Sequence, residues 1–404
     1  MAVTIHGAGC ALMDYLYRDV DFASEAVQAL LRRKPGDGGL NIGGLVFAEA
    51  LERFAGRPID EVLRSITGGR APDRQNVGGP AIVSLIHTAQ LVPEATVRFF
   101  GAVGDDETGA ALRSIAAKTP LRIDDLAKRA GATPATYVFS DPSYAGGHGE
   151  RMFVNQLGVA SHVCPADLGR DFPRADIVQL GGTALVPTLH DSLATLLRDA
   201  RSAGALTVVN TVYDFRAELA HPDERWPLGG EGAYRLIDLL VSDAEEAARL
   251  SGATTPQAAI DWFLARGAGA AIVTNGPQPV SFAAAGPRFS HAPTTTRAVF
   301  TGFARSHAAG EGDTTGCGDT FTGGVVASLA EQMESPRERP RTTAATTTAP
   351  VGRIDLEAAV VRGIASGAFC LTHLGGTFIE AEAGEKLGRV RGVEELYRRS
   401  GAGA

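Results

Sequence analysis

The stretch Asp313-Thr-Thr-Gly-Cys-Gly-Asp319 is followed directly by Thr320-Phe-Thr-Gly-Gly-Val-Val-Ala-Ser-Leu329, an apolar pattern of small residues that predicts a helix. Glycines just before a helix let several backbone N–H groups converge, and the helix N-terminus adds partial positive charge there. These features predict a pocket for a phosphate or a developing anion. A carboxylate would repel a bound phosphate, so Asp319 is best explained as a base that accepts a proton from an attacking hydroxyl. The alternative is a tight loop in which Asp319 only caps the helix.

Short β-type runs alternate with longer helical patterns along most of the 404-residue chain. Such alternation is typical of parallel βαβ units and predicts an α/β fold, a doubly wound, mainly parallel sheet with helices on both faces. The expected strands are Val3–Gly7, Val97–Gly101, Ile177–Leu180, Leu206–Asn210, Leu239–Ser242 and Ala271–Thr274. The expected helices include Ala110–Lys118, Ser192–Ala203, Ala244–Leu250 and Pro256–Arg266.

Two segments break this alternation, at about residues 12–44 and 136–158. The second predicts a hairpin in which Tyr137–Ser140 and Arg151–Asn155 flank a turn-rich stretch. We expect both segments to form a small β lid, because lids that exclude water from a site are often excursions of this kind. The Pro-, Arg- and Thr-rich residues 335–352 are expected to be a disordered loop between two helices.

The composition argues against several classes of function. The chain has 38 Lys+Arg against 46 Asp+Glu, a formal net charge of −8, which disfavours a nucleic-acid or anionic-membrane partner. Its four cysteines are far apart and form no C-x-x-C pair, so neither a zinc site nor a disulfide framework is expected. No signal-peptide pattern opens the chain, and no apolar run reaches the roughly 18 residues that span a bilayer. We therefore expect a soluble, cytoplasmic protein.

The Asp313–Asp319 string closely resembles the second signature, D-T-x-G-A-G-D, of the ribokinase-like (PfkB) family of carbohydrate and nucleoside kinases. The resemblance extends over nearly the whole chain, 1–404, and implies one kinase domain with a lid. It implies that Gly316, Cys317 and Gly318 form an anion hole and that Asp319 is the catalytic base. Cys317 stands where the family usually has Ala or Ser, a change that an anion hole built from backbone N–H groups tolerates.

Two earlier segments are similar to substrate-binding motifs of the same family. Gly9-Cys-Ala-Leu-Met-Asp14 resembles the opening G-x-x-x-x-D, whose Asp binds substrate hydroxyls, although Asp14 alone reads equally well as an ordinary turn residue. Gly78 and Gly79 match the family's G-G-x-x-x-N, whereas Val83 replaces the Asn and removes a polar contact. The resemblance therefore implies Asp14, Gly78 and Gly79 as substrate-binding residues.

The stretch Ser242-Asp-Ala-Glu-Glu246 is similar to the family's N-x-x-E, with Ser242 in place of the Asn and Glu245 at the Glu position. The resemblance implies that Glu245 helps to organise Mg²⁺ through water, in keeping with the preference of this ion for oxygen ligands and retained waters. Acidic residues at a helix N-terminus are also explained by the helix dipole alone.

Further segments resemble the family's nucleotide and cation sites. Thr274-Asn-Gly276 is similar to a T-x-G near the nucleotide, so Thr274 and Gly276 are implied as ATP-binding residues, while Gly375 and Gly376 would close the adenine side. Carbonyls around the D-T-x segment hold K⁺ in relatives, which makes Asp313 and Thr315 candidates for a monovalent cation.

The sequence thus predicts ATP- and Mg²⁺-dependent phosphorylation of a hydroxyl on a small carbohydrate. A nucleoside kinase is the near alternative, because the aromatic residues of the lid region could stack on a base: Tyr15, Tyr17, Phe22 and Phe153. A binding protein without catalysis is an alternative of a different class, disfavoured by Asp319. The resemblance by itself also implies a homodimer formed through the lid.

Overall fold

The computed structural model describes residues 2–34, 36–147, 149–230, 232–300, 303, 314–334 and 353–400. Its main feature is a sheet of nine strands in the order β14-β13-β12-β11-β10-β9-β1-β5-β6. All neighbours from β12 to β6 pair in parallel, and β13 is antiparallel to both of its partners. In that order the bounds are Ala292–Arg297, Gln278–Ala284, Ala270–Asn275, Leu239–Asp243, Leu206–Asn210, Ile177–Gly181, Thr4–Gly9, Thr96–Gly104 and Leu126–Arg129.

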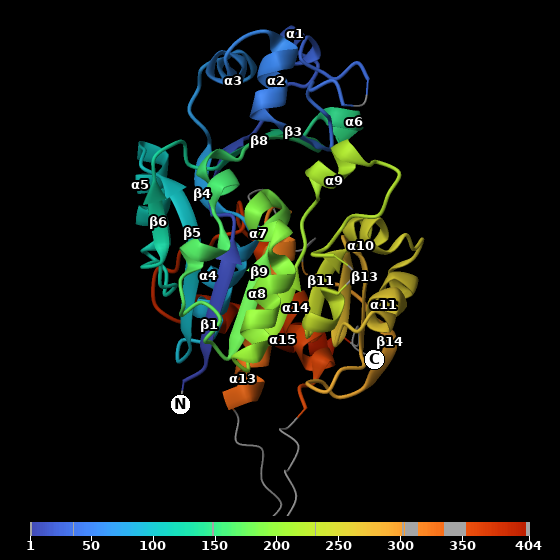
Figure 1. The fold of residues 1–404 in the computed structure, drawn as a ribbon. Coiled ribbons are helices and arrows are strands. Elements are labelled where there is room, and N and C mark those ends of the chain that lie inside the picture. Colours follow the sequence, from blue (N-terminus) through green and yellow to red (C-terminus); the bar gives the residue numbers. More distant parts are fainter. Residues whose placement is uncertain are drawn as a thin grey trace, which may run out of the picture.

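Helices cover both faces of this sheet (Figure 1). Successive residues of a strand point to opposite faces, and the buried core divides accordingly. Val208 and Ile272 pack in a cluster with α4, α13, α14 and α15, whereas Val209 and Val273 pack with α8, α10 and α11. In the same order these helices are Pro80–Leu91, Cys317–Glu334, Leu356–Cys370, Glu385–Arg399, Leu193–Ser202, Ala244–Ser251 and Pro256–Ala265.

The helix that begins with the glycine-rich stretch lies unusually close to its neighbours. A Cβ on Gly323 would stand 2.5 Å from the Ser84 carbonyl oxygen of α4, and one on Gly324 would stand 2.3 Å from Ser366 Oγ of α14. Only glycine permits backbones to approach so closely. The glycine pair therefore fixes α13 between α4 and α14 and, with it, the position of the loop that precedes the helix.

A second sheet of five strands stands above the carboxyl end of the main sheet (Figure 1). Its order is β3-β8-β7-β2-β4, and the chain enters it immediately after β1, since β1 ends at Gly9 and β2 begins at Leu12. We call this sheet, with the three helices on its outer side, the lid. In strand order the bounds are Leu45–Phe47, Glu150–Gln156, Ala135–Asp141, Leu12–Tyr17 and Arg74–Gly78, and helices α1, α2 and α3 span Glu25–Gln28, Ala48–Ala55 and Ile59–Thr67.

The two faces of the lid sheet differ in chemistry. Tyr17, Phe139 and Met152 point to the outer face, where they pack with α2 and α3 in a separate hydrophobic cluster. Arg151 and Phe153, on β8, alternate with these residues and line a cavity between the lid and the main sheet. The lid therefore has its own core and turns its other face to the cavity.

The six expected strands and four expected helices are present, with ends that differ by up to three residues. The hairpin expected within residues 136–158 is also confirmed, as β7 paired antiparallel with β8. The first excursion from the main sheet is longer than expected, because α2, α3 and β4 carry it to Gly78 rather than residue 44. The expected disordered loop, 335–352, lies outside the described residues.

The remaining described elements are short or lie at the edges of the fold. Helix α5 packs against β2, β4 and β5, and α9 leads toward the lid (Figure 1). No helix in the described part of the chain is long and apolar enough to cross a membrane. Helices α5, α6, α7 and α9 span Glu107–Ala116, Tyr144–Gly147, Pro187–Asp191 and Phe215–Ala220.

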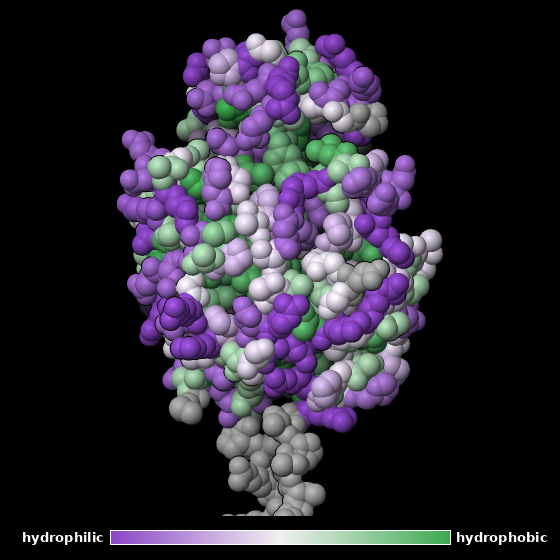
Figure 2. Space-filling view, viewed as in Figure 1, coloured by the Kyte–Doolittle hydropathy of each residue, from purple (hydrophilic) through white to green (hydrophobic). Residues whose placement is uncertain are grey.

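The lid touches the main body through aromatic residues. The rings of Phe47, at the end of β3, and Phe215, at the start of α9, have centroids 3.9 Å apart. On the face drawn in Figure 2, apolar residues gather at the level where the lid meets the body, while hydrophilic residues cover most of the rest. The contact holds the lid above the carboxyl ends of β10 and β11.

Candidate active site

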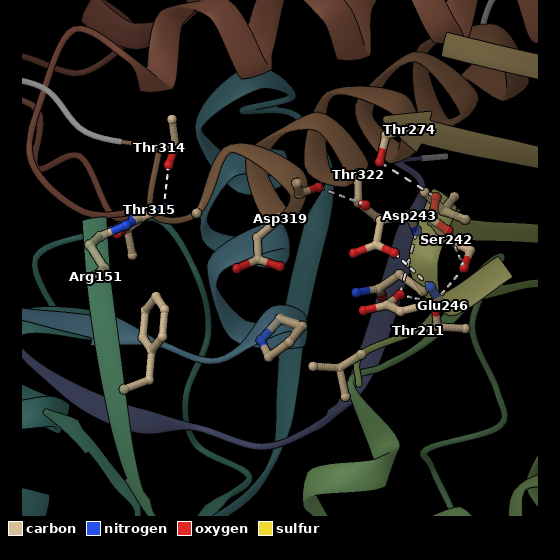
Figure 3. Close-up of a pocket in the computed structure, with 17 residues that line it drawn as sticks. Arg151, Thr211, Ser242, Asp243, Glu246, Thr274, Thr314, Thr315, Asp319 and Thr322 are labelled. Carbon is tan, nitrogen blue, oxygen red and sulfur yellow. Dashed lines mark hydrogen bonds between the residues drawn. The ribbon is translucent and has the colours of Figure 1, made fainter. Parts of the chain in front are cut away.

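A cavity of about 450 Å³ lies between the lid and the carboxyl ends of β10, β11 and β12. In open parallel sheets this edge is where ligands bind, because the strand ends and helix N-termini converge there. Figure 3 shows three groups of side chains around the cavity: Asp319 with its loop, the Asp243–Glu246 segment, and Arg151 from the lid. The fold thus gathers groups that are far apart in sequence, such as Arg151 and Asp319, which are 168 positions apart.

The loop before α13 is strained in a way that requires glycine. Gly316 has φ of +80°, and a Cβ there would lie 2.3 Å from the Cα of Gly376. The Gly316 carbonyl accepts the first helical hydrogen bond, from the Thr320 N–H at 2.8 Å. Gly316 and Gly318 both line the cavity. The loop therefore brings backbone N–H groups and the positive end of α13 to the cavity, as an anion site requires.

Cys317 takes a different position from its neighbours. It is the first residue of α13, it does not line the cavity, and its N–H donates to the Thr314 carbonyl at 3.3 Å. Within the described residues no cysteine forms a disulfide. Of the three residues expected to form the anion hole, the structure places Gly316 and Gly318 at the cavity. Cys317 instead takes part in the turn that shapes the loop, through its hydrogen bond to Thr314.

Asp319 lies in the first turn of α13 and points its carboxylate into the cavity (Figure 3). The surrounding protein desolvates this carboxylate and raises its pKa to about 6. Desolvation disfavours the charged form and makes the carboxylate a stronger base. At neutral pH Asp319 is still ionised, so it can accept a proton at the cavity.

The acidic pair beside Asp319 differs from the expected one by one residue. Helix α10 begins at Ala244, with Asp243 as its N-cap, and the Asp243 carboxylate accepts from the Glu246 N–H at 2.8 Å. Asp243 and Glu246 line the cavity, whereas Glu245 is exposed and does not. Residues three apart share a helix face, so Asp243 and Glu246 point the same way and Glu245 is rotated away from them. The matching pattern is therefore Asp243-x-x-Glu246, and the expectation for Glu245 does not agree with the structure.

Glu246 is buried at the edge of the cavity and accepts a hydrogen bond from the Thr211 hydroxyl. Burial, together with the charge of Asp243, raises the pKa of Glu246 to about 8. Partial desolvation at the cavity wall also raises the pKa of Asp243, although the residue as a whole is exposed. Two adjacent carboxylates that resist ionisation gain from a nearby cation, because opposite charge favours their ionised forms.

The oxygen donors around Glu246 fit Mg²⁺. The carboxylates of Asp243 and Glu246 and the hydroxyls of Thr211 and Ser242 are hard ligands of the kind this ion prefers. Among the described residues no cluster of three or more His, Cys, Asp or Glu side chains forms a metal cage. Such a sparse donor set suits Mg²⁺, which keeps several waters and is held largely through the phosphates of its substrate.

Arg151 connects the lid to the loop that precedes α13. Its guanidinium donates to Thr315 Oγ1 at 2.7 Å and to Thr314 Oγ1 at 2.5 Å (Figure 3). It also lies 5.5 Å from the centre of the Phe153 ring. The sequence offered several polar residues in this hairpin and no means of selecting one, because only the alternation along a paired strand shows which side chains face the cavity.

The expected substrate-binding residues lie together at the base of the lid. A Cβ on Gly78 would stand 2.2 Å from Asp14 Oδ2, so the carboxylate lies directly over this glycine. Gly79 has φ of +110°, and a Cβ there would stand 2.2 Å from the Cys10 carbonyl oxygen. None of the three lines the 450 Å³ cavity itself, but Pro80, the next residue, does.

The expected nucleotide residues are split between two places. Thr274 lines the cavity and its hydroxyl is 3.5 Å from the Ser242 carbonyl oxygen, whereas Gly276 forms the β12–β13 turn with φ of +52° and does not line it. Gly375 and Gly376 lie on the other side, where added Cβ atoms would meet the Asn76 amide and Val83. The glycine pair thus packs against β4, α4 and Gly316, and neither glycine lines the cavity.

Of the two residues expected to hold a monovalent cation, only Thr315 is described. Its carbonyl oxygen is 3.4 Å from Cys370 Sγ, which donates to it. Asp313 lies outside the described residues. The K⁺ site therefore stays a prediction from the resemblance.

Comparison with known structures identifies the same architecture elsewhere. A probable sugar kinase protein from Rhizobium etli CFN 42 superposes with a TM-score of 0.67 at 16% identity, over 100% of both chains. The adenosine kinase from Sinorhizobium meliloti gives 0.67 at 17% identity, over 99% of this chain and 100% of its own. Arabidopsis thaliana ribokinase, complexed with ribose and ATP, gives 0.61 at 16% identity, over 98% and 99%. No curated protein sequence matches the chain significantly.

The fold and the cavity define a kinase, a phosphotransferase with an alcohol group as acceptor, built on the ribokinase fold. The model of the pfkB family carbohydrate kinases matches residues 72–382, which is most of the chain. This protein belongs to the pfkB family of carbohydrate kinases.

Proposed function

We propose that this protein transfers the γ-phosphoryl group of ATP to a hydroxyl of a small carbohydrate, with Asp319 as the general base. The observation that carries the proposal is the meeting of Asp319, the Gly316 and Gly318 backbone and the Asp243–Glu246 pair in one cavity. Kinases of this family use ATP, typically with Mg²⁺.

In the proposed reaction the acceptor oxygen attacks the γ-phosphorus, its proton passes to the Asp319 carboxylate, and the bond to the bridging oxygen breaks to release ADP. N–H groups at the start of α13 stabilise the negative charge on the transferred phosphoryl oxygens, since they already point to the place where it develops. Asp243 and Glu246 would hold Mg²⁺ through water, and this ion supplies charge neutralisation on the phosphates when bound.

Arg151 adds a second role for the lid. Because its guanidinium donates to Thr314 and Thr315 at 2.5–2.7 Å, the lid brings a permanent positive charge to the loop proposed to stabilise the transferred phosphoryl group. A guanidinium suits phosphate oxygens through paired N–H donors. We expect lid closure to exclude water from the reaction and place this charge at the same time.

The test is the Asp319→Asn variant, assayed by coupled detection of ADP release with a panel of sugars. Loss of the base is expected to lower turnover by about 10²–10⁴-fold. The melting temperature should not fall, because the amide avoids the cost of desolvating a carboxylate at the cavity wall. Asp105→Asn is a matched control, since Asp105 lies exposed in a turn far from the cavity wall. Unchanged turnover in Asp319→Asn would refute the assignment.

A nucleoside acceptor is the second candidate, and the observation in its favour is the Phe153 ring in the cavity wall. The other three aromatic residues that suggested a base-binding slot are used elsewhere. Tyr15 stacks on Tyr137 with centroids 5.1 Å apart, Tyr17 packs on Phe139, and Phe22 packs on Tyr144. These pairs lie on the outer face of the lid or at its edge and cannot stack on a substrate in the cavity.

A further inference from the structure

The strands of the lid differ in how the chain ties them to the main body. Strand β2 follows β1, β4 leads into α4, β7 follows β6 after residues 130–134, and β8 leads into the body segment that begins at Gly158. Strand β3 is different, because α1 and α2, its helical neighbours in the chain, both belong to the lid. It is also an edge strand of the sheet. This edge of the lid therefore depends on side-chain contacts to stay close to the main body.

Phe47, the last residue of β3, makes such a contact. Its ring centroid lies 3.9 Å from that of Phe215, the first residue of α9. Phe215 packs in turn against the hydrophobic cluster of the main body that contains Trp226. The pair of half-buried rings thus joins the free edge of the lid to the core of the main body.

The residues on either side of Phe215 are both attached to the end of α7. Asp214 caps the N-terminus of α9, and its Oδ2 lies 3.3 Å from His190 Nε2. The Arg216 guanidinium donates to both oxygens of the Asp191 carboxylate, at 2.6 and 3.3 Å. His190 and Asp191 are the last two residues of α7. We call these two pairs the clamp.

The inner pair of the clamp is buried, with side chains of His190 and Asp214 that are 7% and 5% exposed. His190 Nδ1 lies 2.9 Å from Thr183 Oγ1, so the ring is held from both sides. Burial alone would raise the pKa of Asp214, but interaction with His190 and with the Ala217 N–H lowers it below its ordinary value. Asp214 is therefore charged near neutral pH and holds His190 and the start of α9 together.

We propose that Phe215 is a positioning residue and that the clamp holds its ring against Phe47, so that the lid stays docked over the cavity. The segment before α9 also carries Thr211 and Val212 of the cavity wall, and the Thr211 hydroxyl donates to Glu246. The clamp therefore ties the free edge of the lid to the side of the cavity that we assign to Mg²⁺. The effect on turnover rests on the proposed function, whereas the docking of the lid does not.

The test measures the exposure of the inner face of the lid by hydroxyl-radical footprinting of the ligand-free protein, read by mass spectrometry. Phe153 and Met152 are neighbours on β8 that point to opposite faces, since Phe153 lines the cavity and Met152 is buried in the lid core. Opening of an intact lid exposes Phe153 and leaves Met152 protected. Phe215→Ala should raise the oxidation rate of Phe153 about 2- to 10-fold, as expected for the loss of one aromatic pair. Leu219→Ala, at a position of α9 that is 68% exposed, is the control and should leave this rate unchanged.

A variant of the clamp tests the same docking without touching the rings. Arg216→Gln breaks the outer pair at a partly exposed position and should also raise the oxidation rate of Phe153. Arg216→Lys keeps the charge but not the paired N–H donors, so its effect should be smaller. Arg198→Gln, at an exposed position of α8, is the matched control. Asp214→Asn keeps a good N-cap residue while it removes the charge that faces His190, and it should act in the same direction as Arg216→Gln.

A double variant shows whether the two rings act as one contact. Phe47→Ala combined with Phe215→Ala should open the lid no further than either change alone, because both remove the same interaction.

Turnover gives the consequence for the reaction. Transfer of the phosphoryl group yields ADP and a sugar phosphate, whereas attack by water yields ADP and inorganic phosphate. An open lid admits water, so the ratio of inorganic phosphate to ADP should rise in Phe215→Ala and Arg216→Gln and stay unchanged in the two controls.

Three results would overturn the inference: unchanged oxidation of Phe153 in both Phe215→Ala and Arg216→Gln, an equal rise in the oxidation of Met152, which would show that the lid has lost its fold, or the same response from the control variants. These measurements need neither substrate nor turnover. Failure of the proposed function would instead appear as a lack of sugar-dependent ADP release from the natural protein, while the footprint of Phe153 still responds to the clamp.

Discussion

Lys386 is a lysine in the hydrophobic interior, and its replacement tests how much the burial of an ionisable group lowers the stability of the fold. The residue is fully buried at the start of α15. Its Nζ donates to Gln90 Oε1 of α4 at 2.8 Å, and within the described residues no carboxylate forms an ion pair with it. His87 of α4 and His373, after α14, face it from the neighbouring elements. Burial and nearby positive charge lower the pKa of both histidines, to about 3 for His373, so neither adds a titration near neutral pH.

Burial lowers the pKa of Lys386 from its ordinary value of 10.5 to about 7. Between these values the unfolded chain binds a proton that the folded protein does not, so the free energy of unfolding rises with pH across this window. At 1.36 kcal/mol per unit the full effect is about 4–5 kcal/mol. At pH 7 the lysine costs about 4 kcal/mol, and at pH 9 it costs about 2 kcal/mol.

We predict that Lys386→Met is more stable than the natural protein at pH 7 and that its advantage shrinks by about 2 kcal/mol at pH 9. Urea unfolding of both proteins at pH 7, 8 and 9 measures this difference and cancels every other titration. Lys118→Met, at an exposed position, is the control and should give a difference that does not change with pH. A constant difference for Lys386→Met, or a growing one, would refute the assignment of a neutral lysine to the core.

Three further outcomes test the site. Turnover should fall about tenfold per unit as pH drops below about 6, because protonated Asp319 cannot act as a base, and a flat profile of kcat from pH 5 to 7 would contradict this. Glu246→Gln should raise the Mg²⁺ concentration needed for half-maximal rate at least tenfold. Glu245→Gln, on the exposed side of α10, should leave this concentration unchanged, and equal effects of the two variants would contradict the assignment of Glu246 to Mg²⁺ binding. Gly316→Ala should lower the melting temperature and the rate, because Gly316 has φ of +80° and the backbone of Gly376 leaves no room for a Cβ. We expect the substitution to lower the free energy of unfolding by at least about 1–2 kcal/mol. Gly318→Ala, where a Cβ meets no described atom within 4 Å, should keep its stability.

Much of the fold was predictable because its signals are local. Alternating strand and helix patterns identified β1, β5 and β9 to β12, which are mostly buried. The antiparallel strands β13 and β14 were missed. The edge strand β14 has no apolar run, since it consists mainly of partly exposed Thr and its neighbours. The extent of the lid was also missed, because α2 and α3 are short amphipathic helices that resemble those of the main body until their packing partners are known.

The candidate site was likewise predictable from the sequence only in part. The position of Asp319 at a glycine-rich helix start was readable, because a cap and its glycines are neighbours in sequence. Which member of the Glu245–Glu246 pair lines the cavity was not readable, since this depends on where α10 begins. A shift of one residue turns a side chain by about 100° around the helix axis. Arg151 could not be distinguished from other polar residues of its hairpin for a related reason, since a shift of one residue moves a strand side chain to the other face.

The sequence by itself determined the class of fold, and it singled out the glycine-rich loop and Asp319 as candidates for an anion site and a base, because these residues are close along the chain. Only the tertiary structure decided which groups share the cavity and in what chemical state. It brought Arg151 of the lid, the Asp243–Glu246 pair and Asp319 to one cavity from distant parts of the chain. It also raised the pKa of Asp319 to about 6 and lowered that of Lys386 to about 7. The physical reason is that pairing and desolvation depend on what surrounds a side chain, and a sequence specifies those surroundings only after the chain has folded.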